Sequence, residues 1–272
     1  MFSPLPNKAF YYYTFILAAI LFFSAPVLAD PLSKQGRHPI SGAELAQRVY
    51  GRDTGNDSVS QLIMELISKS GRKRTRGLTT YRKDYGSLRK QVIRFDSPAD
   101  IEGTGLLSLE KEDADTEQFL YLPALRRTRR IVSSQKDHRF VNTDFTFEDM
   151  ERRPVEDSEH CITGQEKIDG ADCRTLESRP GKEAGSQYSM IKSWVAKKTN
   201  VPLLTRYYDK KGKLIKEYRV MKLENIQGIW TETEVVMDDL IKKHKTIMRI
   251  RKIVYDTNLQ DNIFTRQNLE NR

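Results

Sequence analysis

The feature that most constrains the fold is a two-residue periodicity of side chains, repeated in short segments along most of the chain. In residues 62–67, for example, Leu62, Met64 and Leu66 share one face of an extended segment. Clusters of Gly, Pro, Asp and Ser separate the segments, as expected for strands joined by turns. The pattern predicts strands at residues 62–67, 75–82, 88–95, 105–109, 118–122, 128–133, 187–196, 203–208, 214–223, 228–237 and 245–255. We therefore expect about ten to twelve antiparallel strands in one large curved sheet, with few helices.

Three short segments are predicted to be helical instead. Ser41-Gly-Ala-Glu44 matches a capping box, and Leu45 and Val49 lie one helical turn apart on an apolar stripe. A second short helix is predicted at residues 146–152. The C-terminal segment 259–269 is predicted to be partly helical.

The first 29 residues have the pattern of a secretory signal peptide. Residues 10–23 form an apolar run of 14 residues, which is shorter than the ~20 residues that a transmembrane helix needs. Pro26 ends the run, and Val27-Leu28-Ala29 supplies the small or compact residues of a cleavage site. We predict cleavage after Ala29, export of the mature chain and a single mature domain at residues 30–272. An uncleaved membrane anchor is the alternative.

Two cysteines, Cys161 and Cys173, are the only ones in the sequence. The residues between them predict two strands joined at Asp169-Gly170, a favoured hairpin turn. In an exported protein, a pair at this spacing predicts one structural disulfide, worth roughly 3 kcal/mol.

The chain is basic, with 46 Lys and Arg against 37 Asp and Glu. Its basic clusters lie at residues 72–76, 126–130 and 242–245, and each cluster taken alone is typical of a solvated turn or strand end. The sequence lacks the docking helix or stacking aromatics of a nucleic-acid module. The charge of an exported protein therefore favours anionic lipid head groups or acidic envelope polymers as partners, and not nucleic acid.

No catalytic motif accompanies these features. The sequence contains no HExxH, no GxSxG and no P-loop. Its four histidines, at positions 38, 138, 160 and 244, are too scattered to predict a metal site. We therefore expect neither an enzyme nor a bound metal or cofactor, although an enzyme on this fold stays as an alternative.

What the sheet does depends on its apolar face. Large side chains alternate in several predicted strands, which fits either a two-sheet sandwich or a half-barrel with an open cavity. Periodicity alone leaves both architectures open. The residues that we expect to face inward and line such a cavity are Leu62, Met64, Leu66, Leu107, Leu109, Phe145, Phe147, Tyr188, Met190 and Trp194.

Five segments in order along the chain carry a resemblance to a known family. They are FDSPADIEGT at 95–104, QFLYLPALRRTRRI at 118–131, DFTFED at 144–149, YYDKKGK at 207–213 and DNIFT at 261–265. With these motifs the chain resembles the LolA-like family of outer-membrane lipoprotein-sorting proteins, in its larger periplasmic branch, over residues 45–270. The resemblance implies an incomplete antiparallel barrel whose concave face is covered by short helices.

The resemblance also implies a function. Such a protein is a soluble periplasmic carrier that binds the acyl chains of a lipoprotein or lipid and moves this cargo toward the outer membrane. An inner-membrane transporter of the RND/MMPL type is the implied donor, and we expect a monomer with only transient membrane contact. Four arginines are candidates for docking a lipid head group or a partner: Arg126, Arg127, Arg129 and Arg130. A module of the same fold that senses lipoproteins or docks on a transporter, without carrying cargo, is the alternative.

Overall fold

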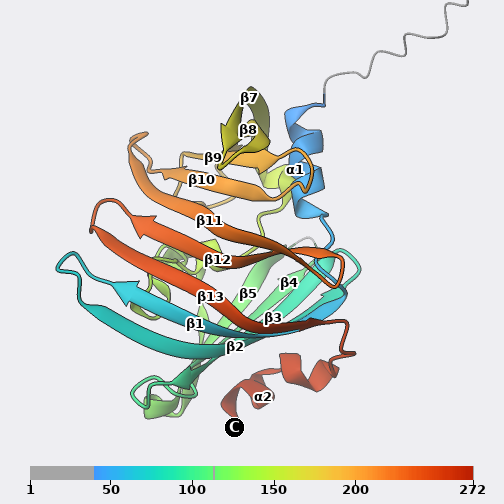
Figure 1. The fold of residues 1–272 in the computed structure, drawn as a ribbon. Coiled ribbons are helices and arrows are strands. Elements are labelled where there is room, and N and C mark those ends of the chain that lie inside the picture. Colours follow the sequence, from blue (N-terminus) through green and yellow to red (C-terminus); the bar gives the residue numbers. More distant parts are fainter. Residues whose placement is uncertain (1–39, 113, 272) are drawn as a thin grey trace, which may run out of the picture. The chain divides into compact units, whose positions relative to one another are not determined.

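The computed structural model describes residues 40–112 and 114–271, and Figure 1 shows their fold. These residues form one sheet of 13 antiparallel strands in the order β6-β5-β4-β3-β2-β1-β13-β12-β11-β10-β9-β8-β7. The sheet is open, with β6 and β7 at its two edges. A single curved sheet is thereby confirmed, and the sandwich alternative is excluded. The predicted signal peptide at residues 1–29 lies outside the described residues.

The strands are β1 (Asp57–Ile67), β2 (Lys73–Tyr85), β3 (Leu88–Ser97), β4 (Gly105–Lys111), β5 (Ala114–Leu122), β6 (Arg127–Ile131), β7 (Ser158–Ile168), β8 (Ala171–Pro180), β9 (Met190–Ala196), β10 (Pro202–Tyr208), β11 (Leu214–Ile226), β12 (Ile229–Asp239) and β13 (His244–Tyr255). The helices are α1 (Gly42–Tyr50) and α2 (Arg266–Glu270). The 3₁₀ turns are η2 (Pro123–Leu125), η3 (Ser133–Gln135), η4 (Phe140–Asn142), η5 (Glu148–Met150), η6 (Val155–Asp157) and η7 (Asp261–Phe264).

The predicted helices are confirmed at both ends of the described chain and corrected in its middle. Ser41 caps α1, because its hydroxyl accepts a hydrogen bond from the Glu44 N–H at 3.1 Å. The C-terminal tail is partly helical, as η7 and α2. The helix predicted at residues 146–152 is only the single 3₁₀ turn η5. Thr146 and Asp149 hydrogen-bond reciprocally as at the start of a helix, but the chain becomes extended at Glu151 (φ −97°, ψ 150°).

The sheet consists of two meanders that meet where β1 pairs with β13. Strands β1 to β6 run outward to one edge, and β7 to β13 return from the other edge. The connection from β6 to β7 must therefore travel between opposite edges of the sheet. We call residues 132–157, which make this connection, the crossing segment.

Register shifts curl the sheet. One lies between Gln61 and Leu62 in the pairing of β1 with β13, and another between Val220 and Lys222 in the pairing of β11 with β12. A bulge increases the local twist and bends its strand. Bends at these central strands turn one face of the sheet into a concave inner face.

The crossing segment packs on this inner face. Phe140 and Phe147 are buried against Met64, Ile93 and Leu106, which come from β1, β3 and β4. Two tilted or edge-on aromatic contacts, with ring centroids 5.7 and 5.8 Å apart, join Phe140 to Phe95 and Phe147. The inner face is thus covered by irregular chain that brings its own core of aromatic residues.

The two α-helices cover opposite faces. Helix α1 lies on the inner side of the β7–β9 end, where Leu45 is buried against Leu176 and Val195. Helix α2 instead covers the outer face of β3 to β5, where Leu269 is buried against Leu107. The expectation that short helices cover the concave face therefore holds for α1 but not for α2.

Candidate functional site

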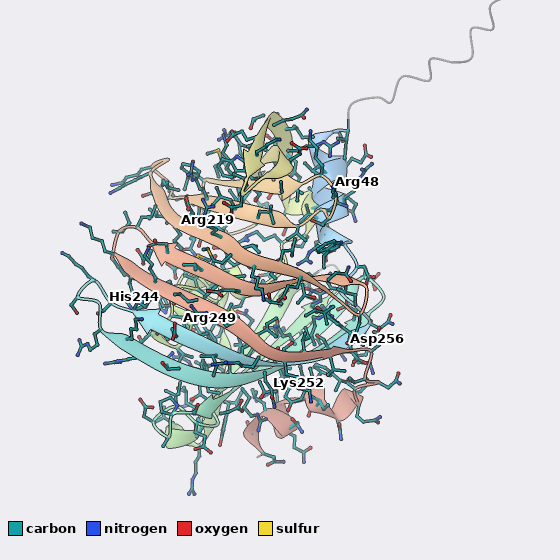
Figure 2. The ribbon with its side chains drawn as sticks, viewed as in Figure 1. Arg48, Arg219, His244, Arg249, Lys252 and Asp256 are labelled. Carbon is teal, nitrogen blue, oxygen red and sulfur yellow. The ribbon has the colours of Figure 1, made fainter. Side chains whose placement is uncertain are left out.

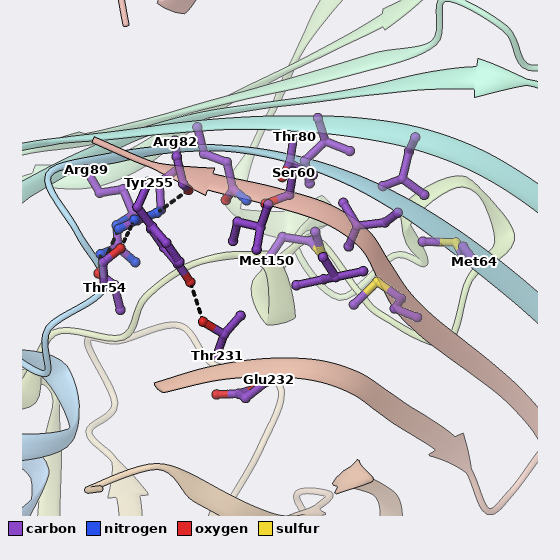
Figure 3. Close-up of a pocket in the computed structure, with 18 of the residues that line it drawn as sticks. Thr54, Ser60, Met64, Thr80, Arg82, Arg89, Met150, Thr231, Glu232 and Tyr255 are labelled. Carbon is purple, nitrogen blue, oxygen red and sulfur yellow. Dashed lines mark hydrogen bonds between the residues drawn. The ribbon is translucent and has the colours of Figure 1, made fainter. Parts of the chain in front are cut away.

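A cavity of about 290 Å³ lies on the concave face, between the central strands and the crossing segment (Figure 3). Strands β1, β2, β3, β12 and β13 form its walls. Its lining divides into an apolar end and a polar end. The apolar residues include Leu62, Met64, Leu78, Ile93, Phe140, Phe145, Met150, Met248 and Ile250, and the polar residues include Arg52, Thr54, Ser58, Ser60, Thr80, Arg82, Arg89, Gln91, Thr231 and Glu232.

Three methionines make the apolar end adaptable. Met64 and Met248 are paired directly across β1 and β13, and Met150 enters from the crossing segment. Unbranched thioether side chains change rotamer readily and fit irregular apolar ligands. This end is therefore suited to a flexible hydrocarbon chain.

Three arginines and two carboxylates form the polar end. Arg52 Nη2 donates to Glu232 Oε1 at 2.9 Å, and Arg89 Nε donates to Asp84 Oδ1 at 2.7 Å. The Arg82 guanidinium lies 3.3 Å from the same Asp84 carboxylate. Three positive groups against two negative groups leave one positive charge uncompensated at this end of the cavity.

Arg82 is the most enclosed of the three arginines. Burial lowers the pKa of its guanidinium to about 10, and the neighbouring Arg89 charge adds to the shift. Its Nη1 donates to Thr54 Oγ1 at 2.7 Å, and Arg89 Nη2 donates to the same oxygen at 2.8 Å. Both guanidinium groups are thus held in place, and Arg82 stays charged at neutral pH, in surroundings where an anion is stabilised.

The crossing segment is tied to β13 by a buried aspartate. Asp144 Oδ2 accepts hydrogen bonds from Thr246 Oγ1 at 2.7 Å and lies 2.6 Å from His244 Nδ1. Arg139 Nη2 donates to Asp144 Oδ1 at 2.7 Å. Arg76, buried in β2, donates to the Val141 carbonyl at 2.6 Å. These bonds hold the roof of the cavity over its apolar end.

A second buried aspartate ties the crossing segment to the other half of the sheet. Asp149 Oδ2 accepts from Lys216 Nζ at 2.8 Å, and its Oδ1 accepts from the Tyr188 hydroxyl at 2.8 Å. Burial by itself raises the pKa of Asp149, but the charges of Lys216 and Arg153 outweigh it, so the pKa lies below its usual value. The roof is therefore fixed on both sides by charged hydrogen bonds.

The structure places half of the expected lining residues at or beside the cavity. Leu62, Met64 and Phe145 line it. Leu66 and Phe147 belong to the adjoining core of the inner face. Their contact with a ligand stays a prediction.

Tyr188 also lies on the inner side, but in the anchor of the crossing segment. It is fully buried, and its ring centroid lies 4.9 Å from that of Tyr207. Its role in this structure is to hydrogen-bond Asp149.

Four expected lining residues lie on the outer face instead. Leu107 pairs directly with Val92, whereas the inner-facing Ile93 pairs with Leu106, so Leu107 and Leu109 point away from the cavity. Met190 and Trp194 alternate with Ile191, which lies opposite the inner-facing Tyr207 and shares its cluster. The error has one cause: adjacent residues in these strands are both apolar, so the sequence does not show which of them faces inward. The four corrected residues are Leu107, Leu109, Met190 and Trp194.

The expected docking arginines lie at the β6 edge of the sheet, away from the cavity. Arg126 adopts a left-handed conformation (φ 46°) before the strand begins, and Arg127, Arg129 and Arg130 follow it in β6. All four are exposed, and Arg130 Nη2 lies 3.1 Å from Glu117 Oε1. Docking through these residues stays a prediction.

The predicted disulfide is wrong, because both cysteines are free thiols. The hairpin itself is confirmed, since β7 and β8 are joined at Asp169 and Gly170. However, Cys161 lies opposite Glu177 and Cys173 lies opposite Glu166. Five residues of extended chain separate the two positions by about 17 Å, far beyond the ~7 Å Cα separation that a disulfide spans.

Sequence reasoning missed Arg52, Arg82 and Arg89. A signal was nevertheless present in β2, where Leu78, Thr80 and Arg82 share one face at two-residue spacing. A charged residue on the inward face of a strand is unusual unless it is paired or binds a ligand.

A second cavity, of about 570 Å³, lies among α1, the end of β4 and the crossing segment. Charged side chains dominate its walls. Burial raises the pKa of Glu151 to about 7, and its Oε1 has no hydrogen-bond partner among the described residues. Such walls suit water better than an acyl chain. The charged lining residues are Glu110, Lys111, Glu112, Asp115, Lys136, Glu148, Glu151, Arg152, Arg153, Glu156 and Asp157.

Within residues 40–112 and 114–271, no helix is long and apolar enough to cross a membrane. The same part of the chain contains no group of three or more His, Cys, Asp or Glu residues that could hold a metal ion.

Solved structures identify the family. A DUF1329 family protein from Desulfovibrio piger is 34% identical to this chain and superposes with a TM-score of 0.80. The match covers 84% of this chain and 97% of that one. The protein belongs to the DUF1329 family. A family model described as an uncharacterized protein matches residues 87–271.

Two further solved structures share the fold. A domain from Vibrio parahaemolyticus that has been assigned to outer membrane lipoprotein sorting is 28% identical, with a TM-score of 0.79, and the match covers 84% of this chain and 98% of that one. A LolA superfamily protein from Nitrosomonas europaea is 17% identical, with a TM-score of 0.67 and coverage of 85% and 100%, and shares the fold. No protein of curated function matches the sequence. The resemblance found in the sequence is thus confirmed.

Proposed function

We propose that this DUF1329 protein is a periplasmic carrier of an amphiphile with one apolar chain and one anionic head group. The observation that carries the proposal is the division of the cavity into a methionine-rich apolar end and an arginine end with one uncompensated positive charge. A monoanionic head group neutralises that charge. The lipoprotein-sorting assignment of the relative from Vibrio parahaemolyticus supports cargo of the lipid or lipoprotein class.

The volume of the cavity limits the size of the cargo that it can hold. At about 290 Å³ it lies at the lower limit of small-molecule sites, which range from about 300 to 1,000 Å³. Each buried methylene contributes about 0.8 kcal/mol, so about ten methylenes supply roughly 8 kcal/mol before the costs of association. A single chain is therefore sufficient for useful affinity. A multiply acylated lipoprotein requires the crossing segment to move.

The residues at the cavity favour carriage over catalysis. The described lining residues include neither histidine nor cysteine, and the relative from Vibrio parahaemolyticus is assigned to lipoprotein sorting. The predicted signal peptide supports a periplasmic location. Within this proposal the cargo moves toward the outer membrane, with an inner-membrane transporter of the RND/MMPL type as its donor.

Native mass spectrometry after export to a bacterial periplasm and purification without detergent tests the proposal. We expect a bound lipid, or stoichiometric uptake of an added C12 fatty acid, whose ten methylenes match the cavity. Thr80→Trp places an indole in the cavity and is expected to abolish uptake. Thr79→Trp is the matched control, because the neighbouring side chain points to the other face and bonds Asp96. Equal uptake by the two folded variants contradicts the site.

A second comparison tests the head group. Arg52→Gln removes one positive charge while Glu232 stays, so the arginine end loses its net charge. We expect this variant to bind the fatty acid at least tenfold more weakly, and to bind the fatty alcohol of the same chain length as the wild type does. Equal weakening for both probes indicates a packing defect instead of lost charge recognition.

A further inference from the structure

The turns at one end of the central strands concentrate the charge of the protein. Because β2, β1, β13, β12, β11 and β10 are consecutive in the sheet, the turns that join them in pairs are neighbours along one rim. In Figure 1 these turns lie side by side on the left. We define the basic rim as residues 68–74, 240–243 and 209–213.

Nearly all of the net charge of the chain lies in this rim. Its three segments contain nine Lys and Arg residues and one aspartate, a net charge of +8, whereas the whole 272-residue chain carries +9. In Figure 2 many side chains on this side, where His244 is labelled, end in nitrogen. The nine basic residues, all exposed, are Lys69, Arg72, Lys73, Arg74, Lys210, Lys211, Lys213, Lys242 and Lys243.

Among the residues that the structure describes, few of these charges have a paired partner. Lys242 lies 3.8 Å from Asp239, and Lys210 donates to the Tyr188 carbonyl at 3.2 Å. Asp209, the one carboxylate of the rim, is occupied by the backbone N–H groups of Lys211 and Lys213. The rim therefore presents an almost unbroken positive surface to solvent.

Two apolar side chains project from the centre of the same surface. Leu240 and Ile241, in the turn between β12 and β13, are 38% and 50% exposed. Two exposed aliphatic residues followed directly by Lys242 and Lys243 have the pattern of a loop that inserts into a bilayer interface.

We propose that the basic rim docks on an anionic lipid bilayer, with Leu240 and Ile241 inserted among the acyl chains. Charge complementarity selects the partner: eight net positive charges along one rim match a surface of closely spaced phosphates. The two apolar side chains favour a bilayer over a soluble polyanion, because only the bilayer has an apolar interior in which they can be buried. The proposal does not depend on what the cavity binds.

Docking through the basic rim fixes the orientation of the cavity relative to the membrane. Met64, at the apolar end, lies three residues from the end of β1 at the rim, about 10 Å along the strand. Arg82 and Arg89 lie by the turn between β2 and β3, at the opposite end of the strands. The rim also adjoins the roof anchor, since His244 directly follows Lys243 and contacts Asp144. The membrane therefore faces the apolar end of the cavity.

The acidic loop between β3 and β4 marks one boundary of the positively charged surface. This loop carries Asp100 and Glu102, Asp96 lies at the end of β3 just before it, and the loop follows the β1–β2 turn along the same end of the sheet. The rim thus ends at β2, and the arginines of β6 lie beyond the acidic loop.

Co-sedimentation of the exported protein with vesicles tests the proposal. We expect binding to vesicles of equal parts phosphatidylglycerol and phosphatidylcholine at about 0.05 M NaCl, where charge screening is weak, and none to phosphatidylcholine alone. Each lysine near an anionic surface contributes about a fivefold factor, so Lys242→Gln/Lys243→Gln is expected to weaken binding about 30-fold. The matched control is Lys198→Gln/Lys252→Gln, which removes two exposed charges toward the opposite end of the strands.

The outcomes are distinct. Strong loss in the rim variant with little change in the control supports the proposal. Absence of wild-type binding to the anionic vesicles, or equal loss in both variants, overturns it. Leu240→Ser/Ile241→Ser is expected to weaken binding at least tenfold, and unchanged affinity overturns the insertion of these residues. Because uptake of a fatty acid is measured separately, failure here is distinguishable from failure of the carrier function.

Discussion

Asp149 is the residue whose replacement should most weaken the anchorage of the crossing segment. Its side chain is only 1% exposed, and Lys216, which donates to it at 2.8 Å, is 8% exposed. Asp149→Asn keeps the size of the side chain but removes the charge that compensates Lys216 and Arg153. Removing one partner of a buried ion pair typically costs about 3–5 kcal/mol, because the other charge is left without compensation.

A loss of this size is large against the total. Domains are typically stable by about 5–15 kcal/mol, so Asp149→Asn should remove a substantial fraction of the free energy of unfolding. Urea denaturation, followed by tryptophan fluorescence, measures the change. Asp137→Asn is the matched control: this aspartate lies in the same crossing segment but is 59% exposed, and its replacement should change stability by less than about 0.5 kcal/mol.

A double-mutant cycle separates the ion pair from other effects. Lys216→Met removes the opposite charge, and the double variant Asp149→Asn/Lys216→Met leaves neither charge of the pair. We expect the double variant to be more stable than the sum of the single losses predicts, with a coupling energy of about 1–3 kcal/mol. A loss below about 1 kcal/mol in Asp149→Asn, or a coupling near zero, would refute the reasoning.

Three other predictions follow from the same structure. The folded-state pKa of Glu151, about 7, lies above its unfolded value of 4.5, so the folded state retains a proton that the unfolded chain loses. The free energy of unfolding of the wild type, measured relative to that of Glu151→Gln, should therefore fall by about 3 kcal/mol from pH 4.5 to pH 8. A difference that stays constant with pH contradicts the burial of this carboxyl. Cys161 should react with iodoacetamide in the native protein, whereas Cys173, whose thiol pKa is raised by burial, should react only after unfolding. If mass spectrometry finds that neither cysteine reacts unless a reductant is added, the assignment of both as free thiols is wrong. Leu107→Ala should cost about 2–5 kcal/mol in thermal or urea unfolding but leave fatty-acid affinity unchanged, and a parallel loss of affinity contradicts its place on the outer face.

The proposed carrier function and the proposed docking surface depend on different parts of the structure. The cavity depends on the inner faces of β1, β2, β3, β12 and β13, and on the roof that the crossing segment supplies. The basic rim depends only on the turns at one end of the strands. Variants in one region should therefore leave the other intact, which allows ligand uptake and vesicle binding to be measured independently.

Local pattern in the sequence was sufficient for the strands, the hairpin at Asp169-Gly170 and the N-terminal cap at Ser41. Each of these depends on neighbours within a few residues, as do strand periodicity, turn conformation and helix capping. The five motifs then indicated the family and its open sheet. None of this required knowledge of which strands pair.

Only the tertiary structure decided which side of each strand faces inward. Where two adjacent residues are both apolar, as at Leu106 and Leu107, periodicity is ambiguous, and the choice depends on whether the crossing segment or α2 covers that face. The disulfide failed for a related reason, because register within β7 and β8 places Cys161 and Cys173 at different levels of the hairpin.

Pairing between distant segments likewise created both proposed surfaces. The arginine end joins Arg52, Arg82 and Arg89 to Glu232, which lies between 143 and 180 residues further along the chain, and the basic rim joins turns that follow β1 and precede β13. Each charge alone is typical of a solvated surface residue in the sequence. These charges come together because β1 pairs with β13. That pairing joins segments from the two ends of the described chain, so no pattern within a few residues of sequence predicts which charged side chains become neighbours.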